Sequence, residues 1–313
     1  MELDRCAEFL RAHDNFTIIT HRRPDGDTLG SAAALCHALR RLGKTAWLFP
    51  NKGITETYLP WMEGYQAPEG YTGEVFVCVD VAGREMLCRG YDGRVDLWLD
   101  HHLDRGEPRE NAVVWPDKAS CGELVLELIE RLGLAIDKEE ADLLYIAVST
   151  DTGCFLHGNT TAETHRAAAK LLDAGADLPR INKRIFVAKR RSRLKLEGLI
   201  YDSLESFRDG AINVAYVTLE MMRLSGATED DCEDIANLAG QIPENRVGIT
   251  VRELTAEPPR CKVSLRTDGA VDASLLCARF GGGGHRMAAG CDLPLPPRET
   301  AEAIRAAVEE AWA

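Results

Sequence analysis

The sequence predicts an α/β protein in which a doubly wound, mainly parallel sheet is followed by a smaller C-terminal α/β domain. Apolar, β-branched runs alternate with helical patterns as far as about residue 180, an alternation typical of parallel sheets. A basic stretch then interrupts the pattern, and new strands begin near residue 211. A length of 313 residues also favours two domains. We expect a first domain over 1–190, a helical linker or hinge over 191–210, and a second domain over 211–313.

The first domain is expected to open with a short helix over 1–12 and a buried strand over 16–20. An Ala- and Leu-rich helix over 30–42 ends at Gly43, and a strand over 45–49 completes a βαβ unit. The segment that follows is rich in Pro and Gly and is expected to be mostly loop. The remaining predicted elements are strands over 75–79 and 95–99 and helices over 120–133, 138–149 and 162–174.

The second domain is predicted from a new set of apolar runs. Its acidic segment 229–234 is interpreted as a solvated helix start, which the helix dipole favours. The predicted elements are strands over 211–219, 247–254 and 261–267 and helices over 228–240, 272–280 and 299–312.

Composition restricts the function. A formal charge of −13 disfavours a broad surface for long nucleic acids, which need a basic footprint. No apolar run reaches the roughly 20 residues of a membrane helix, and the N-terminus lacks the pattern of a signal peptide, so a cytoplasmic location without membrane contact is expected. The ten cysteines contain no C-x-x-C pair, which favours reduced, buried thiols.

Potential metal ligands recur at the ends of the predicted strands. The first strand is followed by H-R-R-P-D-G-D, with His21, Asp25 and Asp27. Taken alone, Pro-Asp-Gly-Asp is also a good turn sequence. However, Asp80 follows another strand, Asp100-His101-His102 a third, and Asp151 a further apolar segment. Ligands bind at the carboxyl ends of strands in such sheets, and clustered carboxylates repel one another without a cation. We therefore predict a metal site there.

Imidazole and carboxylate donors suit manganese, zinc, magnesium or cobalt, and the absence of thiolates argues against structural zinc. Asp25 and Asp27 can face different cations, and a third aspartate can bridge them. Two cations at roughly 3.5–4 Å activate a water for displacement at phosphorus. The expected chemistry is phosphoester hydrolysis.

The second domain contains residues suited to hold an anion. Gly281 to Gly284 precede His285, and four glycines let backbone N–H groups approach a phosphate. A flexible linker is the alternative, disfavoured by the apolar residues that follow. Ser264-Leu265-Arg266 adds a guanidinium suited to phosphate, although an exposed structural arginine is an equal alternative.

Together, the motifs H-x-x-P-D-G-D, D-H-H, S-T-D-T-G and G-G-G-H resemble the DHH phosphoesterase superfamily with its DHH-associated C-terminal domain. The resemblance runs from about His21 to Gly290. Within the superfamily the chain is similar to the nanoRNase group, bifunctional enzymes that degrade short RNA and dephosphorylate 3′-phosphoadenosine 5′-phosphate (pAp). The resemblance implies a hydrolase with two divalent cations, Mn²⁺ first and Mg²⁺ or Co²⁺ as alternatives, in a cleft between the domains.

The resemblance also implies roles for single residues. Asp80 would bridge the cations and, with His101, His102 and Asp100, form the catalytic set, in which Asp100 orients the imidazoles. His102 and His285 would face the substrate phosphate. The implied ligands are His21, Asp25 and Asp80 for one metal and Asp27, Asp80, His101 and Asp151 for the other; the implied substrate contacts are His102, Ser264, Arg266, Gly282, Gly283, Gly284 and His285.

Several readings stay open at this point. The expected partners are short RNA or small nucleotides, in an order that the sequence does not rank, and a homodimer is open. A cyclic di-AMP phosphodiesterase is the main alternative. An inorganic pyrophosphatase, a RecJ-type exonuclease and a non-catalytic nucleotide-binding protein fit the motifs less well. The eight basic residues between Arg180 and Lys195 could line the cleft or form solvated helix faces.

Overall fold

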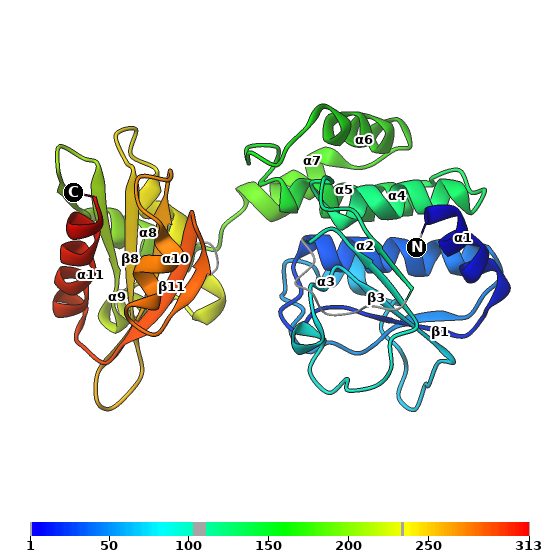
Figure 1. Cartoon of the computed structure of the whole chain (residues 1–313), viewed down its shortest axis with the longest axis horizontal. Helices are drawn as coiled ribbons and strands as arrows, with labels where there is room; N and C mark the ends of the chain where they lie inside the picture. Colours follow the sequence, from blue (N-terminus) through cyan, green and yellow to red (C-terminus); the bar gives the residue numbers. More distant parts are fainter. Residues whose placement is uncertain (1, 103–110, 233–234, 313) are drawn as a thin grey trace. The chain divides into compact units, whose positions relative to one another are not determined.

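The structure is a computed structural model that describes residues 2–102, 111–232 and 235–312. The chain divides into two compact units, Met1–Ala188 and Lys189–Ala313, each with its own sheet (Figure 1). Helix α8 (Arg191–Asp202) lies in the predicted linker range, and its Leu196 and Ile200 pack with Ala215 in a core of the second unit. This helix is therefore part of the second unit, and a hinge in this range stays a prediction.

The sheet of the first unit has the order β2-β1-β3-β4-β5, and all of its neighbouring strands are parallel. This confirms the predicted parallel sheet and adds one edge strand, β5, that was not predicted. In a sheet of this order the direction of winding reverses between β1 and β3, the place where ligands bind in such folds. The strands are β1 (Phe16–Ile19), β2 (Ala46–Leu48), β3 (Val75–Val79), β4 (Leu97–Asp100) and β5 (Ala112–Val114).

Side chains alternate between the two faces of this sheet. Phe16 and Ile18 join the main core beneath helices α2 (Gly26–Arg41), α4 (Cys121–Arg131) and α5 (Lys138–Asp151), which Figure 1 shows stacked over one face. Ile19 and Trp98 face the other way, where the loop residues Val81 and Leu87 cover them. The remaining helices of this unit are α1 (Leu3–Ala12), α3 (Leu59–Met62), η1 (Arg84–Met86), α6 (Ala162–Asp173), α7 (Leu178–Asn182) and the π-helix η2 (Lys183–Val187).

The second unit has a mixed sheet of the order β10-β11-β9-β8-β7-β6, in which only β7 and β8 pair in parallel. Helices α10 (Ala273–Ala278) and α11 (Pro297–Ala311) contribute to the core on one face, and α8 and α9 (Leu219–Ser225) to the core on the other. The strands are β6 (Glu205–Phe207), β7 (Ile212–Val217), β8 (Val247–Leu254), β9 (Arg260–Thr267), β10 (Gly283–His285) and β11 (Ala288–Leu293).

The helix predicted over 228–240 is wrong. The chain forms two short 3-10 segments, η3 (Glu229–Cys232) and η4 (Ile235–Gly240), and residues 233–234 lie outside the described residues. Asp231, which was expected in a solvated helix start, is only 5% exposed. Its carboxylate accepts from Thr228 N and Ser192 Oγ, which binds the segment to α8. Such local side-chain bonds compete with regular helix.

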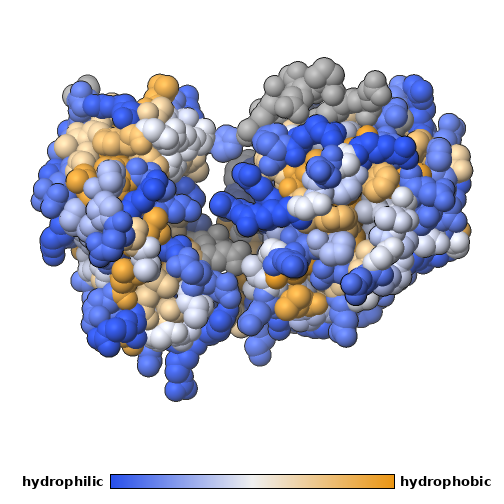
Figure 2. All heavy atoms as spheres, turned by 90° about the horizontal axis from the view of Figure 1, so that it is seen from below, coloured by the Kyte–Doolittle hydropathy of each residue, from blue (hydrophilic) through white to orange (hydrophobic). Residues whose placement is uncertain are grey.

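The state of the cysteines and the polarity of the surface are those that the amino-acid composition suggests. All ten cysteines are free and most are buried, as expected. The face seen in Figure 2 is largely hydrophilic, with scattered apolar side chains. Among the described residues, no helix combines the length and apolarity needed to cross a membrane.

Candidate metal centre and active site

The predicted ligands of the first unit meet at the carboxyl end of its sheet. His21 follows β1, Asp80 follows β3, and Asp100 is the last residue of β4. Asp25 caps α2 by accepting from Thr28 N at 3.1 Å, and Asp27 lies in the first turn. Helix α2 therefore starts earlier than predicted, which places Asp27 on a helix instead of a loop.

Two groups of ligand atoms share Asp80. In the first, His21 Nε2 lies 3.4 Å from Asp25 Oδ2 and 3.9 Å from Asp80 Oδ2. In the second, His101 Nε2 lies 3.5 Å from Asp27 Oδ2 and 3.5 Å from Asp80 Oδ1.

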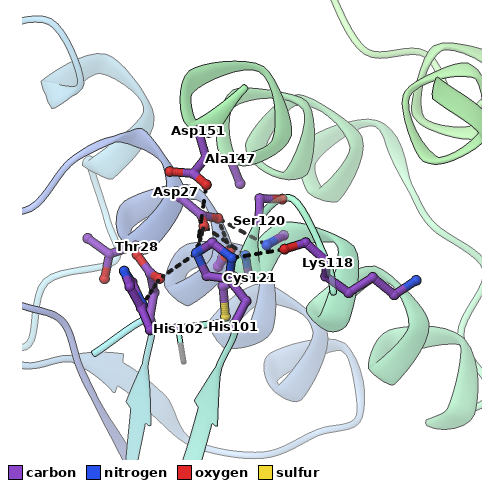
Figure 3. A network of polar contacts seen from close by, with 12 residues as sticks. Asp27, Thr28, His101, His102, Lys118, Ser120, Cys121, Ala147 and Asp151 are labelled. Atoms are coloured by element: carbon purple, nitrogen blue, oxygen red, sulfur yellow. Dashed lines mark hydrogen bonds and ion pairs between the residues drawn. The ribbon is translucent and has the colours of Figure 1, made fainter. Parts of the chain in front are cut away.

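Asp151, the last residue of α5, completes the second group, with Oδ2 3.7 Å from His101 Nε2 (Figure 3). The two oxygens of Asp80 thus face different groups, as a bridging carboxylate would.

The central carboxylates of the cluster, Asp27 and Asp80, are buried and electrostatically unfavourable without a cation. Burial, followed by repulsion from Asp27, raises the pKa of Asp80 well above its usual value. Burial and the charge of Asp151 do the same to the pKa of Asp27. Burial also opposes ionisation of Asp25, but the hydrogen bond from His21 holds its pKa below the usual value. Divalent cations would offset this repulsion.

Asp80 has two further features of a ligand site. Its Oδ1 is buried and has no hydrogen-bond partner among the described residues. Its backbone has a φ of 58°, a left-handed conformation that costs a non-glycine residue roughly 1–3 kcal/mol. An unsatisfied buried oxygen on a strained backbone requires an explanation. A hard cation between the carboxylates would satisfy that oxygen, so the donor set fits divalent cations.

The N-terminus of α4 holds Asp27 in place. Cys121 N donates to Oδ2 at 2.7 Å, and Gly122 N donates to Oδ1 at 3.0 Å (Figure 3). Ser31 Oγ also donates to Oδ1, at 3.0 Å. Free N–H groups at a helix N-terminus favour a carboxylate. The sequence predicted this helix but gave no signal for this contact, because Asp27 and Cys121 lie 94 residues apart.

The two histidines of D-H-H are oriented differently. His101 Nδ1 lies 3.1 Å from Lys118 O, which leaves Nε2 directed at the carboxylates. Asp100 Oδ1 accepts from His102 Nδ1 at 2.8 Å, and this bond raises the pKa of His102 against the effect of burial. Asp100 is therefore the hydrogen-bond partner of the His102 ring, whereas a backbone carbonyl is the partner of the His101 ring.

Close helix packing brings Asp151 to the cluster. A Cβ on Gly26 would lie 2.4 Å from Thr150 Oγ1, and one on Gly30 would lie 2.3 Å from Leu143 O. Glycine at these positions lets α2 approach α5 more closely than any other residue would. The glycine of D-G-D thus has a packing role next to Asp151.

The predicted substrate residues of the second unit lie in rows across its sheet. Ala288 on β11 is directly opposite both His285 on β10 and Arg266 on β9. Residues opposite one another share a face, so His285 and Arg266 lie on the same face, two strand spacings or roughly 10 Å apart. Ser264 and Gly283 form a parallel row on that face through Gly290.

The glycine-rich segment is a paired hairpin strand, so it is not a flexible linker. One detail corrects the sequence analysis. The N–H of Gly282, expected to approach the substrate, donates to Cys277 O at 2.9 Å. A Cβ on Gly282 would lie 2.2 Å from Gly290 O, so this glycine serves close packing. Gly283 and Gly284 stay the predicted backbone contacts.

The basic segment is largely engaged in local contacts. Lys189 Nζ and Arg193 Nε both donate to Glu197, at 2.9 and 2.7 Å. Arg190 Nε lies 3.6 Å from Asp231 Oδ1. These pairs neutralise part of the charge that suggested phosphate capture.

A parallel sheet with a carboxylate and imidazole cluster at its winding reversal is typical of a metal-dependent phosphoesterase. Residues 15–148 match the DHH family, N-terminal domain, and residues 211–313 match the DHHA1 domain. The chain therefore belongs to the DHH family of phosphoesterases, which are hydrolases.

Named relatives extend over most of the chain. It is 32% identical over 290 residues to the bifunctional oligoribonuclease and PAP phosphatase NrnA of Thermus thermophilus, covering 92% of this chain and 87% of that protein. The Bacillus subtilis protein of the same name is 27% identical, over 88% of this chain and 89% of its own length. An exopolyphosphatase-related protein from Bacteroides fragilis has a similar crystal structure, with a TM-score of 0.86 at 25% identity over 98% of this chain and 95% of that one.

Proposed function

We propose that this phosphoesterase hydrolyses short oligoribonucleotides and pAp-like 3′,5′-bisphosphate nucleotides with two divalent cations. The observation that carries the proposal is Asp80, whose two oxygens face two separate groups of His and Asp ligands. His21 and Asp25 would complete the first metal site. Asp27, His101 and Asp151 would complete the second, with Mn²⁺ as the preferred ion.

When bound, two cations lower the pKa of a shared water and withdraw charge from the phosphate. The residues around them hold and orient the substrate. His102 keeps Nδ1 on Asp100, a hydrogen bond that raises the pKa of the ring, and a protonated His102 would donate through Nε2 to a phosphate oxygen or to the leaving group. In the second unit, Arg266 and His285 share a sheet face and would bind a phosphate of the same substrate.

The charge distribution supports short substrates. The chain carries a net −13, and Lys189, Arg190 and Arg193 pair with acidic partners. A long RNA would gain few phosphate contacts outside the site. The relatives named oligoribonuclease and PAP phosphatase point to the same substrates.

The experiment is a substrate panel with added Mn²⁺: pAp, a linear diadenylate, cyclic di-AMP, pyrophosphate and an RNA of about 20 nucleotides. We expect hydrolysis of pAp and the linear dinucleotide, with the long RNA much slower. Cyclic di-AMP as the best substrate would establish the alternative phosphodiesterase, and pyrophosphate as the best would contradict the proposal. Asp80→Asn serves as the inactive control for each substrate.

A further inference from the structure

Arg184, in the basic segment, makes a two-point contact with a loop of the first unit. Its Nε donates to Thr57 O at 2.8 Å, and its Nη2 donates to Glu56 O at 2.7 Å. The guanidinium also lies 5.9 Å from the ring centre of Trp61. A planar guanidinium can bind two successive carbonyls at fixed geometry, which an ammonium cannot. The contact therefore fixes the position of residues 56 and 57.

The same loop contacts a candidate metal ligand at its other end. Asn51 Nδ2 donates to His21 O at 2.9 Å and to Thr20 Oγ1 at 3.0 Å, and Asn51 is only 6% exposed. Gly53 N donates to Asn51 Oδ1 at 2.9 Å, and a Cβ on Gly53 would lie 3.0 Å from Pro24 Cδ. The start of the loop is thus packed against the segment that carries His21 and Asp25.

We propose that Arg184 is a positioning residue of the metal site, which acts through the loop 51–57 and Asn51 on His21. Holding the carbonyls of Glu56 and Thr57 restricts the loop, and the restricted loop keeps the Asn51 amide on the His21 carbonyl. This backbone anchor keeps His21 Nε2 directed at Asp25 and Asp80. The inference gives one member of the basic segment a role other than substrate capture. It rests on the proposed ligand role of His21.

The test measures binding of Mn²⁺ alone, by electron paramagnetic resonance of the free ion. Arg184→Ala should weaken one of the two binding events by roughly three- to tenfold, since it removes two hydrogen bonds outside the ligand shell. Asn51→Ala removes the residue that contacts His21 directly and should weaken the same binding event by about 10- to 100-fold. The matched control is Arg180→Ala, which removes the same charge from the same Trp61, 5.5 Å away. The control should change both events by less than about twofold.

A double variant tests the route. If Arg184 acts through Asn51, then Arg184→Ala combined with Asn51→Ala should bind Mn²⁺ no more weakly than Asn51→Ala alone. Hydrogen exchange of the metal-free protein gives a second readout. Amides of residues 20–25 and 51–57 should exchange faster in Arg184→Ala than in Arg180→Ala. Arg184→Lys, a milder change, should lie between wild type and Arg184→Ala in both measurements.

Three results would overturn the inference. In the first, Arg184→Ala matches Arg180→Ala in Mn²⁺ binding and in hydrogen exchange. In the second, the effect of Arg184→Ala on Mn²⁺ binding adds fully to that of Asn51→Ala. The third applies if Arg184→Ala does not fold: Arg184→Lys then binds Mn²⁺ and exchanges its amide hydrogens as the wild type does. His21→Ala separates the two proposals: unchanged Mn²⁺ binding in that variant overturns the ligand assignment itself, whereas weakened binding there with an unaffected Arg184→Ala overturns only the role of Arg184.

Discussion

In the first unit the central carboxylates of the candidate site are buried and held by the protein, whereas in the second unit the candidate residues lie on a more accessible sheet face. Asp27 and Asp80 are 1% and 2% exposed, and Asp27 accepts bonds from the start of α4. His285 is exposed, and Arg266 is partly exposed on the same face. The candidate metal ligands thus form one pre-organised cluster, and the candidate substrate residues of the second unit form an open row on the sheet surface.

The difference follows from the charges involved. Buried like charges raise one another's pKa, so the first cluster is favourable only with cations. The partly exposed Arg266 and the exposed His285 carry a smaller penalty, since water screens them. Substitutions in the first unit should therefore alter metal content, and substitutions in the second should alter substrate use alone. Four predictions test or refine this division.

The largest effect is expected at the shared ligand. Asp80→Asn keeps the shape of the side chain and tolerates the left-handed φ of 58°. It should lower the content of both metals, which elemental analysis measures. It should also reduce the rate of hydrolysis by more than about 100-fold, which exceeds the usual cost of losing a residue that only hydrogen-bonds a metal ligand. Asp25→Ala and Asp27→Ala should each affect mainly one metal. Full occupancy and activity in Asp80→Asn would refute the bridging assignment.

A smaller effect, without loss of metal, is expected in the second unit. His285→Ala should retain both metals and lower kcat/KM for every nucleotide substrate by about 100-fold, the usual cost of one donor to a transition-state oxygen. The control is Met287→Ala, a substitution in the adjoining hairpin turn at a side chain 53% exposed. Loss of metal in His285→Ala would make this residue a ligand, and unchanged kinetics would make the hairpin purely structural.

Two glycine-to-alanine substitutions compare a tightly packed position with an open position on a helix surface. Gly26→Ala would place a Cβ 2.4 Å from Thr150 Oγ1 and should lower the free energy of unfolding by about 1–3 kcal/mol. Gly198→Ala, in α8, meets nothing within 4 Å and should raise it by about 0.5–1 kcal/mol. Urea denaturation measures both. Equal effects of the two substitutions would contradict the packing role of Gly26 beside the cluster.

The smallest effect is expected in the basic segment. Replacing Arg190, Arg191 and Arg193 with Gln should change KM by less than about twofold for dinucleotide and tetranucleotide alike, because Arg190 and Arg193 are already engaged in ion pairs with acidic side chains. Steady-state kinetics at low salt would check this. A rise in KM that grows with substrate length and fades with salt would instead place the segment in substrate capture.

The sequence predicted the elements with strong local patterns and missed the short ones. The strands β1, β3 and β4 and the helices α4, α5 and α6 lie close to their predicted ranges, since apolar periodicity and caps define them locally. The short elements β5, α3 and α9 were not predicted. The predicted helix over 228–240 failed because Asp231 is buried by contacts with α8, which no local pattern shows.

The sequence by itself determined which residues are candidates to bind metal, because parallel strands place their carboxyl ends, and so His21, Asp80 and His101, at one edge of the sheet. Only the tertiary structure decided how these groups are held. The donors to Asp27 come from α4, the partner of His101 is the Lys118 carbonyl, and the anchor of His21 is Asn51. These contacts join segments distant in sequence, and they form because packed helices and loops leave one arrangement that satisfies the buried polar groups.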